Sequence, residues 1–290
     1  MMKKMWFGTR GFCRWVPMVD ADAAFTKEGW SSSTQLLNGG NLVRGSKAGH
    51  REYLMSWGAG RTRDELRPIS DFADGVFDSD SRGLIYFISP ESADKNAAPQ
   101  SLAFPGQEDA PSLSLDADPV LIATAANDYG YPARSAQYTL TGTEVMRKTY
   151  IPIPPGYSAW VGFHGSATGD AGLQVTEFVN GTSPYASPVV LTPLGVDTDT
   201  RVNAEFGLSG GAQKGIEIQL VEDSGTITLT GVIVQIIPTG VTPSIGDYIS
   251  GQGHSGCRFL GKPQTTVYLI GDRRESVGMT ARLNEVGAWL

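Results

Sequence analysis

Residues 253–257, with the sequence GHSGC, place a histidine, a serine and a cysteine between glycines, which is one way in which a protein presents a nucleophile. A serine nucleophile of the α/β-hydrolase kind needs Gly-x-Ser-x-Gly at a sharp strand-to-helix turn. Here the second glycine comes one residue early, and the following residues 260–263 (LGKP) break a helix. We therefore expect no catalytic residue at Ser255, and interpret the segment as a glycine-rich loop.

A thiol nucleophile at Cys257 would need a base, and the chain has only His50, His164 and His254. His254 lies three residues from Cys257, too close along one turn both to pair with the thiol and to be oriented for catalysis. We expect Cys257 to pack in the apolar interior. The glycines around it permit either a positive φ or a close approach of two backbones, and the sequence leaves both explanations open.

Two acidic segments resemble metal-binding loops in part. Residues 78–83 (DSDSRG) follow the spacing of a calcium loop, but Arg82 occupies a ligand position and Ser89 stands where the closing acid belongs. Residues 196–201 (VDTDTR) offer two aspartates and nothing further. The histidines and cysteines show no zinc spacing. We predict no metal site and no cofactor.

Carboxylates and aromatic rings give two further hypotheses about sugars. Hydrolysis of a glycoside needs two carboxylates from separate strands, and nothing in the sequence selects a pair among Asp170, Glu177, Glu205 and Glu217. We therefore predict that the protein is not an enzyme.

Exposed tyrosines could instead bind a glycan by stacking on its apolar faces. The loop DYGYP offers Tyr129 and Tyr131, and the loop SPYASP offers Tyr185. The alternative is that these rings cover the edges of the core or lie at a subunit interface.

Composition and charge exclude several classes of protein. The net charge is −7 and no long run of Lys or Arg occurs, so we expect no binding to nucleic acid. No stretch of 18 consecutive apolar residues predicts a membrane span. The first residues, MMKKMWFGTRGFCRW, lack the apolar core of a signal peptide, which predicts a protein made in a cytoplasm without an export signal.

Strand patterns dominate the chain. The 36 glycines and 17 prolines suit turns between short strands better than helix interiors. In residues 119–243 the strand-like segments follow one another at roughly regular intervals. They are SAQYTL, KTYIPIPP, SAWVGFHG, GLQVTEFV, PVVLTPL, RVNAEFGL, GIEIQLV and TITLTGVIVQIIP. Within the last, Gly231 would allow a bulge that switches the inward side chains from Ile227 and Leu229 to Val232 and Val234. This region is predicted to be a jelly-roll β-sandwich.

The remaining residues are predicted to form a second β domain. Residues 1–118 are rich in aromatic residues, and we expect them to be completed by residues 244–290. Residues 60–75 are the best helical candidate, which Pro68 should limit, and residues 91–119 are linker-like in composition. The predicted fold class is therefore all-β, with two β-sandwich (jelly-roll-like) domains and very little helix.

An ordered series of motifs resembles the minor tail proteins of long-tailed (siphovirus-type) phages that infect actinobacteria. The motifs extend from Trp6 to Trp289 in the order WFGTRGF, WVP, LLNGG with HREYLMSW, LRPISDFADG with GLIYF, TITLTGVIVQIIPTG, GHSGCRF and TARLNEVGAWL.

The resemblance implies a structural protein of the virion tail, at or near the distal tip. Such a protein would pack as a symmetric oligomer with copies of itself and with other phage tail proteins. The alternative function is a receptor-binding module that holds host cell-wall polysaccharide.

Overall fold

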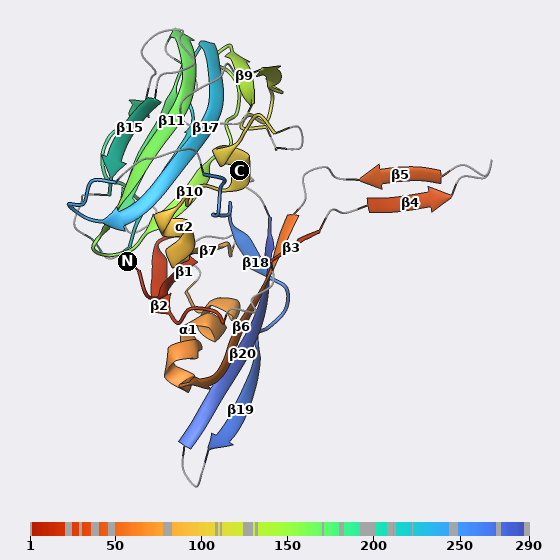
Figure 1. The fold of residues 1–290 in the computed structure, drawn as a ribbon, viewed down its shortest axis with the longest axis vertical. Coiled ribbons are helices and arrows are strands. Elements are labelled where there is room, and N and C mark those ends of the chain that lie inside the picture. Colours follow the sequence, from red (N-terminus) through yellow and green to blue (C-terminus); the bar gives the residue numbers. More distant parts are fainter. Residues whose placement is uncertain are drawn as a thin grey trace.

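Among the described residues, strands greatly outnumber helices, which confirms the prediction of an all-β fold with very little helix. In Figure 1 a sandwich of strands lies above a second, twisted sheet that carries a helix, and a two-stranded ribbon extends to the side. The computed structural model describes residues 2–20, 25–28, 31–35, 41–45, 50–77, 83–107, 110, 112–123, 130, 133–169, 171–179, 183–191, 201–207, 211, 213–221, 223–243, 249–270 and 274–286.

The sandwich has the strand order of a jelly roll. One antiparallel sheet runs β15-β11-β17-β9-β8, and the other runs β10-β16-β12, with β13 and β14 both pairing with β12. Its strands are β8 (Val120–Ala123), β9 (Arg134–Leu140), β10 (Thr149–Ile153), β11 (Tyr157–Gly169), β12 (Leu173–Val179), β13 (Ser183–Pro184), β14 (Val189–Leu191), β15 (Arg201–Phe206), β16 (Lys214–Leu220) and β17 (Gly225–Pro238). The chain passes between the two sheets as eight-stranded jelly rolls do, so the predicted sandwich is confirmed.

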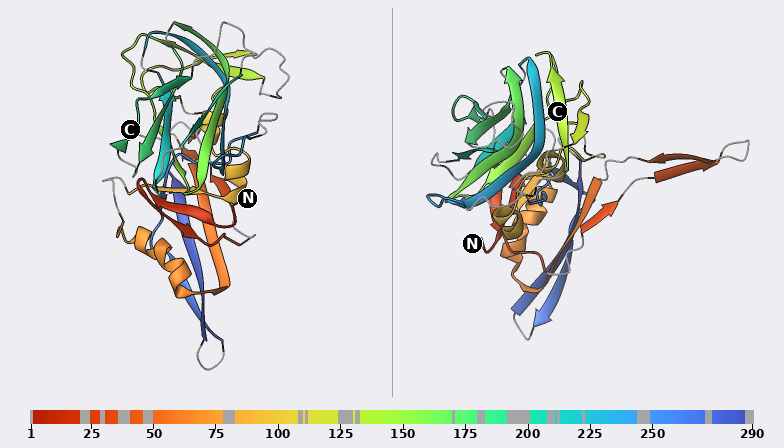
Figure 2. Two further views of the ribbon diagram at one scale, coloured as in Figure 1. Left: turned by 90° about the vertical axis from the view of Figure 1, so that its left-hand side faces the viewer. Right: turned by 45° about the horizontal axis from the view of Figure 1, so that its top comes forward.

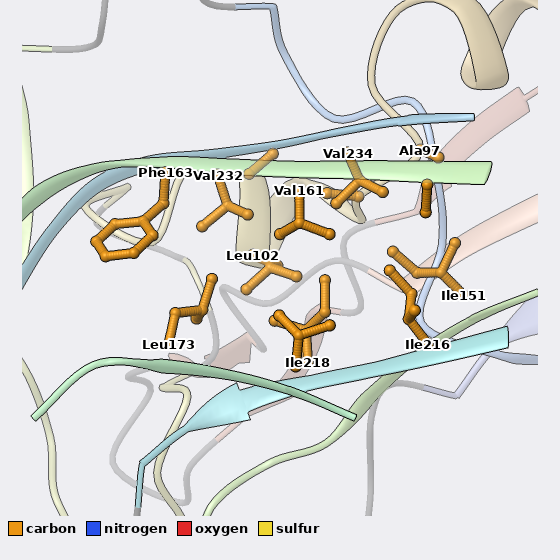
Figure 3. Close-up of a cluster of buried hydrophobic side chains, with 14 of the residues drawn as sticks. Ala97, Leu102, Ile151, Val161, Phe163, Leu173, Ile216, Ile218, Val232 and Val234 are labelled. Atoms are coloured by element: carbon orange, nitrogen blue, oxygen red, sulfur yellow. The ribbon is translucent and has the colours of Figure 1, made fainter. Parts of the chain in front are cut away.

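The core of the jelly roll follows from alternation along its strands. Ile216, Ile218 and Leu220 of β16 are buried and point between the sheets, as predicted. Figure 3 shows these isoleucines facing Val161 and Phe163 of β11, with Leu102 lying between the two layers. Because each strand turns every second side chain inward, the two sheets bury one continuous apolar layer.

A β-bulge interrupts β17 at the predicted glycine. Gly231 is opposite His164 and Leu229 is opposite Gly165, so Thr230 has no partner residue in β11. The extra residue shifts the alternation by one position, and Val232 then joins Leu229 in the core. The predicted bulge and the predicted switch of inward side chains are both confirmed.

The lower unit is one antiparallel sheet drawn from both ends of the chain. Its order is β2-β1-β7-β18-β20-β6-β3, and β19 pairs with residues 274–280 of β20. The strands are β1 (Met5–Thr9), β2 (Phe12–Val16), β3 (Phe25–Glu28), β6 (His50–Arg61), β7 (Ile85–Ile88), β18 (Cys257–Phe259), β19 (Gln264–Ile270) and β20 (Arg274–Glu285). The C-terminal strands β18 and β20 thus share a sheet with β1, β6 and β7. Figure 2 shows the β19–β20 hairpin at the end farthest from the sandwich.

Helix α1 (Arg63–Ala73) packs on this sheet through Leu66, Ile69 and Phe72. Thr62 and Glu65 form a capping box at its start. We expected Pro68 to limit the helix, but the helix continues through it. The proline removes one backbone hydrogen bond, and burial of the apolar face compensates for that loss.

The described part of residues 91–119, a segment that is linker-like in composition, is folded against the jelly roll. It contains most of α2 (Pro90–Asp94) and all of α3 (Gln100–Ala103). Ala97, Ala98, Leu102 and Ala103 are buried in the jelly-roll core. Their small or apolar side chains fill an opening between the sheets, which composition alone did not reveal.

The ribbon consists of β4 (Ser31–Gln35) and β5 (Asn41–Gly45), which pair only with each other among the described strands. Figure 1 and the right-hand view in Figure 2 place it beyond the end of the β3–β6 pair. In Figure 1 it points away from both units.

Candidate functional site

The GHSGC loop joins the jelly roll to the lower sheet, and His254 lies at its centre. This histidine is only 5% exposed. Its Nδ1 accepts a hydrogen bond from the Gly256 N–H at 3.3 Å and lies 3.5 Å from the Cys257 Sγ. Its Nε2 lies 3.0 Å from both the backbone nitrogen and the carbonyl oxygen of Phe87, so the ring hydrogen-bonds to the backbone of this residue. His254 therefore fixes the loop to β7.

Ser255 and Cys257 are oriented by other groups. Glu285 Oε1 accepts from both the N–H and the Oγ of Ser255, at 2.8 and 3.0 Å. Cys257 is buried, and burial, with a smaller contribution from the charge of Glu285, raises the pKa of its thiol well above the usual value. This cysteine therefore stays a protonated thiol at neutral pH. Because the thiolate is the reactive form, the Cys257 thiol is not an activated nucleophile.

The glycines of the loop serve two different purposes. A Cβ on Gly251 would stand 2.6 Å from the Ala98 carbonyl oxygen, and one on Gly253 would stand 1.9 Å from the Ala97 carbonyl oxygen. Gly256 instead has a φ of +119°, in the region that favours glycine. The two explanations that the sequence left open therefore both apply, at different glycines.

Asn96 holds the other side of this junction and was missed by sequence reasoning. It is fully buried, and its Nδ2 donates to the carbonyl oxygens of Val232 (3.0 Å) and Ile249 (2.9 Å). Its Oδ1 accepts from the N–H groups of Val234 (2.9 Å) and Ala98 (3.1 Å). The side chain thus continues the edge of β17 as a neighbouring strand would. The only signal in the sequence is the pair of small residues after it, which permits close backbone approach.

Arg10, in the turn between β1 and β2, makes a second contact between the units. Its Nη1 lies 2.9 Å from Glu217 Oε2 on β16. Its guanidinium carbon lies 4.9 Å from the ring centroid of Tyr150 and 4.4 Å from that of Phe178. A guanidinium held by a carboxylate and two aromatic faces is well fixed. Burial also raises the pKa of Tyr150.

The amide of Gln213 extends this contact to β2. The Cys13 N–H donates to Gln213 Oε1 at 2.6 Å, and Gln213 Nε2 donates to the Cys13 carbonyl oxygen at 3.2 Å. The base of the jelly roll is therefore hydrogen-bonded to the lower sheet on two sides, by the GHSGC loop and by the β1–β2 hairpin.

The carboxylates considered for glycoside hydrolysis do not form a described pair. Glu217 is engaged by Arg10, and Glu205 Oε1 accepts from Ser158 Oγ at 2.6 Å on the other sheet. Glu177 lies on β12, and Asp170 is outside the described residues.

The predicted binding aromatics are described in part. Tyr185 is 59% exposed, and its N–H donates to the Glu177 carbonyl oxygen at 2.9 Å. Tyr129 and Tyr131 lie outside the described residues.

Metal ligands and membrane spans were also sought in the described residues. Asp78, Asp80 and Arg82 of the first acidic segment fall outside them, as do residues 196–200 of the second. The described part of the chain contains no cluster of His, Cys, Asp and Glu that could hold a metal ion. Within it, no helix has the length and hydrophobicity required to cross a membrane.

Comparisons with known proteins give only distant similarities. No family model and no curated protein matches the chain. The enzymatically active domain of tailspike protein 4 of bacteriophage CBA120 is 15% identical, with a TM-score of 0.32, over 42% of this chain and 18% of the tailspike chain. Structures of the Gt and Gx strains of infectious bursal disease virus are each 11% identical over 97% of this chain and 78% of the viral chain, with TM-scores of 0.24 and 0.23.

Proposed function

We propose that this protein is a structural subunit of a phage tail. It is assembled at or near the distal tip, as a symmetric oligomer with other tail proteins. The ordered motifs that resemble minor tail proteins support this proposal. The structure adds support of a different kind, because hydrogen bonds and buried side chains join its two β units on two sides. A subunit that transmits load within a particle needs such a connection.

The observation that carries the proposal is the β4–β5 ribbon. Its strands pair only with each other among the described strands, and it extends away from both units. An isolated two-stranded hairpin is at best marginally stable in water. Its remaining edges have unpaired N–H and C=O groups that can join a neighbouring sheet. We therefore infer that the ribbon lies on an adjacent copy in the assembled tail.

A deletion of the ribbon tests this proposal. Residues 29–48 would be replaced by a short Gly/Ser linker that joins β3 directly to β6. The intact protein should be an oligomer in size-exclusion chromatography with light scattering, and the shortened protein should be smaller. Thermal unfolding monitors whether both remain folded. A monomeric intact protein at high concentration, with no affinity for other tail proteins, would contradict the proposal.

The same proposal also predicts what the protein does not need and where it is found. In this role it needs no catalytic residue, no cofactor, no nucleic acid and no membrane insertion. It would be made in the host cytoplasm and reside in the virion tail. Antibody labelling of virions, followed by negative-stain microscopy, would locate it at the tip or elsewhere.

A second candidate function is the binding of host cell-wall polysaccharide by the jelly roll. The exposed ring of Tyr185 favours it, because an exposed aromatic face can stack on a sugar. Tyr185→Ala should then weaken binding to intact host cells, with a loss on the order of 1 kcal/mol for one stacked ring. Tyr185→Phe, which keeps the face, is the matched control. Equal binding by the alanine variant would remove this role from Tyr185.

A further inference from the structure

The two units of the chain carry net charges of opposite sign. Residues 91–243, which include the jelly roll, contain 16 Asp and Glu against 6 Lys and Arg, a net charge of −10. The rest of the chain contains 14 Asp and Glu against 17 Lys and Arg, a net charge of +3. We propose that neighbouring copies bind each other head to tail, with an acidic surface of one jelly roll against a basic surface of the next copy's lower sheet.

This inference deepens the proposed function, since it rests on assembly of copies and names the surfaces that meet. Surfaces of opposite charge steer two subunits together and set their relative orientation. Both surfaces are separate from the β4–β5 ribbon.

The acidic surface lies on the loop before β8 and the turn after β9. Asp116 and Asp118 are exposed, and Glu144 is partly exposed. The Val145 N–H donates to Asp116 Oδ2 at 2.8 Å, which joins the loop to the turn, and N–H groups of the turn donate to Glu144. Two of the three carboxylates are therefore fixed in position. The exposed side chains of Leu115 and Val145 complete the acidic surface.

This surface is at the end of the jelly roll away from the lower unit. The turn that carries Glu144 follows Leu140, which ends β9 and is opposite Gly225 at the start of β17. Asn96 of the junction bonds to the other part of β17, at residues 232–234. Figure 1 shows β9 toward the top of the sandwich and the lower sheet beneath it. The acidic surface is thus available to another chain while the two units of its own chain stay joined.

The basic surface lies on β18 and β20, on the face of the lower sheet opposite α1. Cys257 and Leu283 are buried in the cluster that α1 covers, so Arg258 and Arg282, which alternate with them, point to the other face. Both arginines are exposed, and neither forms an ion pair with a carboxylate of the described residues. The exposed Leu260 lies beside Arg282, to whose carbonyl oxygen its N–H donates at 2.8 Å.

Each surface has a neighbouring group of the opposite sign. The partly exposed Glu52 of β6 shares the face of the arginines, opposite Asn284 of β20. The partly buried Arg147 follows the turn that carries Glu144. Two arginines against one glutamate, and three carboxylates against one arginine, leave the sign of each surface unchanged.

Charge complementarity favours a second copy as the partner. Each surface repels a surface like itself, and both combine charges with exposed aliphatic side chains. A copy of this chain carries the complement of each surface, and the two occur in equal number. One kind of contact therefore covers both. Such a heterologous contact closes into a ring when its rotation permits.

Reversal of charge in the full-length chain tests the contact. One variant carries Arg258→Glu and Arg282→Glu, and the other carries Asp118→Lys and Glu144→Lys. Each places like charges against each other in the contact, and should weaken association of copies about tenfold or more. The dissociation constant is measured by light scattering over a concentration series, and thermal unfolding shows whether each variant is folded.

A chain with all four reversals distinguishes this contact from other effects of charge. Its two surfaces are complementary again, so it should regain association close to that of the parent. It should bind the parent chain more weakly than it binds itself, because mixed contacts place like charges together. If the folded chain with four reversals does not regain association, the two surfaces do not meet and the inference is wrong.

Arg67→Glu with Lys95→Glu is the matched control for the first variant. Both side chains are exposed, on α1 and just after α2, and the change in net charge is the same. Association should stay as in the parent. An equal loss in this control would assign the effect to net charge alone and overturn the inference. Association of the parent that does not weaken with added NaCl would also overturn it, since salt screens exposed charges.

The remaining outcomes separate this inference from the proposed function. If the parent is oligomeric and both variants associate as it does, the charged contact is wrong and the tail-subunit proposal stands. If the first variant loses binding to another tail protein but not to copies of itself, the basic surface has a different partner and the inference is wrong. A parent protein that stays monomeric overturns both proposals.

Discussion

The junction between the two units and the β4–β5 ribbon differ in how far their backbone polar groups find hydrogen-bond partners within the chain. At the junction, Asn96 makes four hydrogen bonds and His254 bonds to both its own loop and β7. The ribbon strands pair only with each other among the described strands. Buried polar groups without partners are costly, so the junction had to be completed within one chain. The outer edges of the ribbon can be completed by another chain.

The proposed function assigns the junction residues to holding the subunit together and the ribbon to contacts between subunits. Substitutions in the junction should lower the free energy of unfolding of the isolated chain. Changes at the ribbon should alter assembly and leave that free energy nearly unchanged. The following substitutions test the first half of this comparison, from the largest expected effect to the smallest.

Gly253→Ala should have the largest effect on stability. Its Cβ would stand 1.9 Å from the Ala97 carbonyl oxygen, so two backbone segments would have to separate. We expect a loss of about 4 kcal/mol in the free energy of unfolding, measured with urea.

Gly240→Ala is the matched control for this substitution. Gly240 has a φ of +86° but nothing within 4 Å of its ideal Cβ position. It should therefore lose only about 1 kcal/mol, from backbone strain. Equal losses at the two positions would mean that close packing at the junction is not the cause.

Asn96→Ala should destabilise the chain by about 3 kcal/mol, because it leaves backbone N–H and C=O groups of three chain segments (β17, Ile249 and Ala98) without their partner. Gln252→Ala, at an exposed side chain in the segment that contacts Asn96, is the control and should change the free energy of unfolding little. A loss below about 1 kcal/mol for Asn96→Ala would show that water replaces the amide, and that the junction is less closed than its geometry indicates.

Arg10→Ala should lower the free energy of unfolding by about 2 kcal/mol, since it removes a guanidinium from two aromatic faces. Among the described residues, the largely buried Glu217 would keep one ion-pair partner, Lys148 at 3.8 Å. Arg67→Ala, at an exposed ion pair on α1, is the control and should change stability little. The measurement is again urea unfolding. Equal effects of the two substitutions would argue against a second contact that stabilises the junction.

Glu144→Gln should have the smallest effect, and one that depends on pH. The Thr141 hydroxyl and nearby backbone N–H groups donate to this exposed carboxylate and lower its pKa from 4.5 to about 2. Because the folded pKa is lowered, the stabilisation is present above pH 4.5 and is lost as the pH falls toward 2. The parent chain should therefore melt slightly above the variant at pH 7, with the difference vanishing at low pH. A constant difference would exclude the carboxylate charge as its cause.

Prediction from the sequence succeeded where apolar and polar side chains alternate along a strand. The alternation in GIEIQL and the glycine in TITLTGVIVQII correctly predicted the inward residues of β16 and the bulge in β17, because side-chain direction follows from strand geometry alone. It failed for residues 91–119 and for Pro68. There the decisive energy comes from packing against elements distant in the sequence.

For the GHSGC loop, residue types and spacing were enough to question a nucleophilic role, but not to say what the loop does. The sequence by itself determined the strand content, the inward faces and the absence of a hydrolase elbow, since these depend on local geometry. Only the tertiary structure decided that Asn96, His254 and Glu285 meet around the loop, and that Arg10 reaches Glu217. Long stretches of chain separate these residues. Their proximity results from the folding of the whole chain rather than from any local pattern.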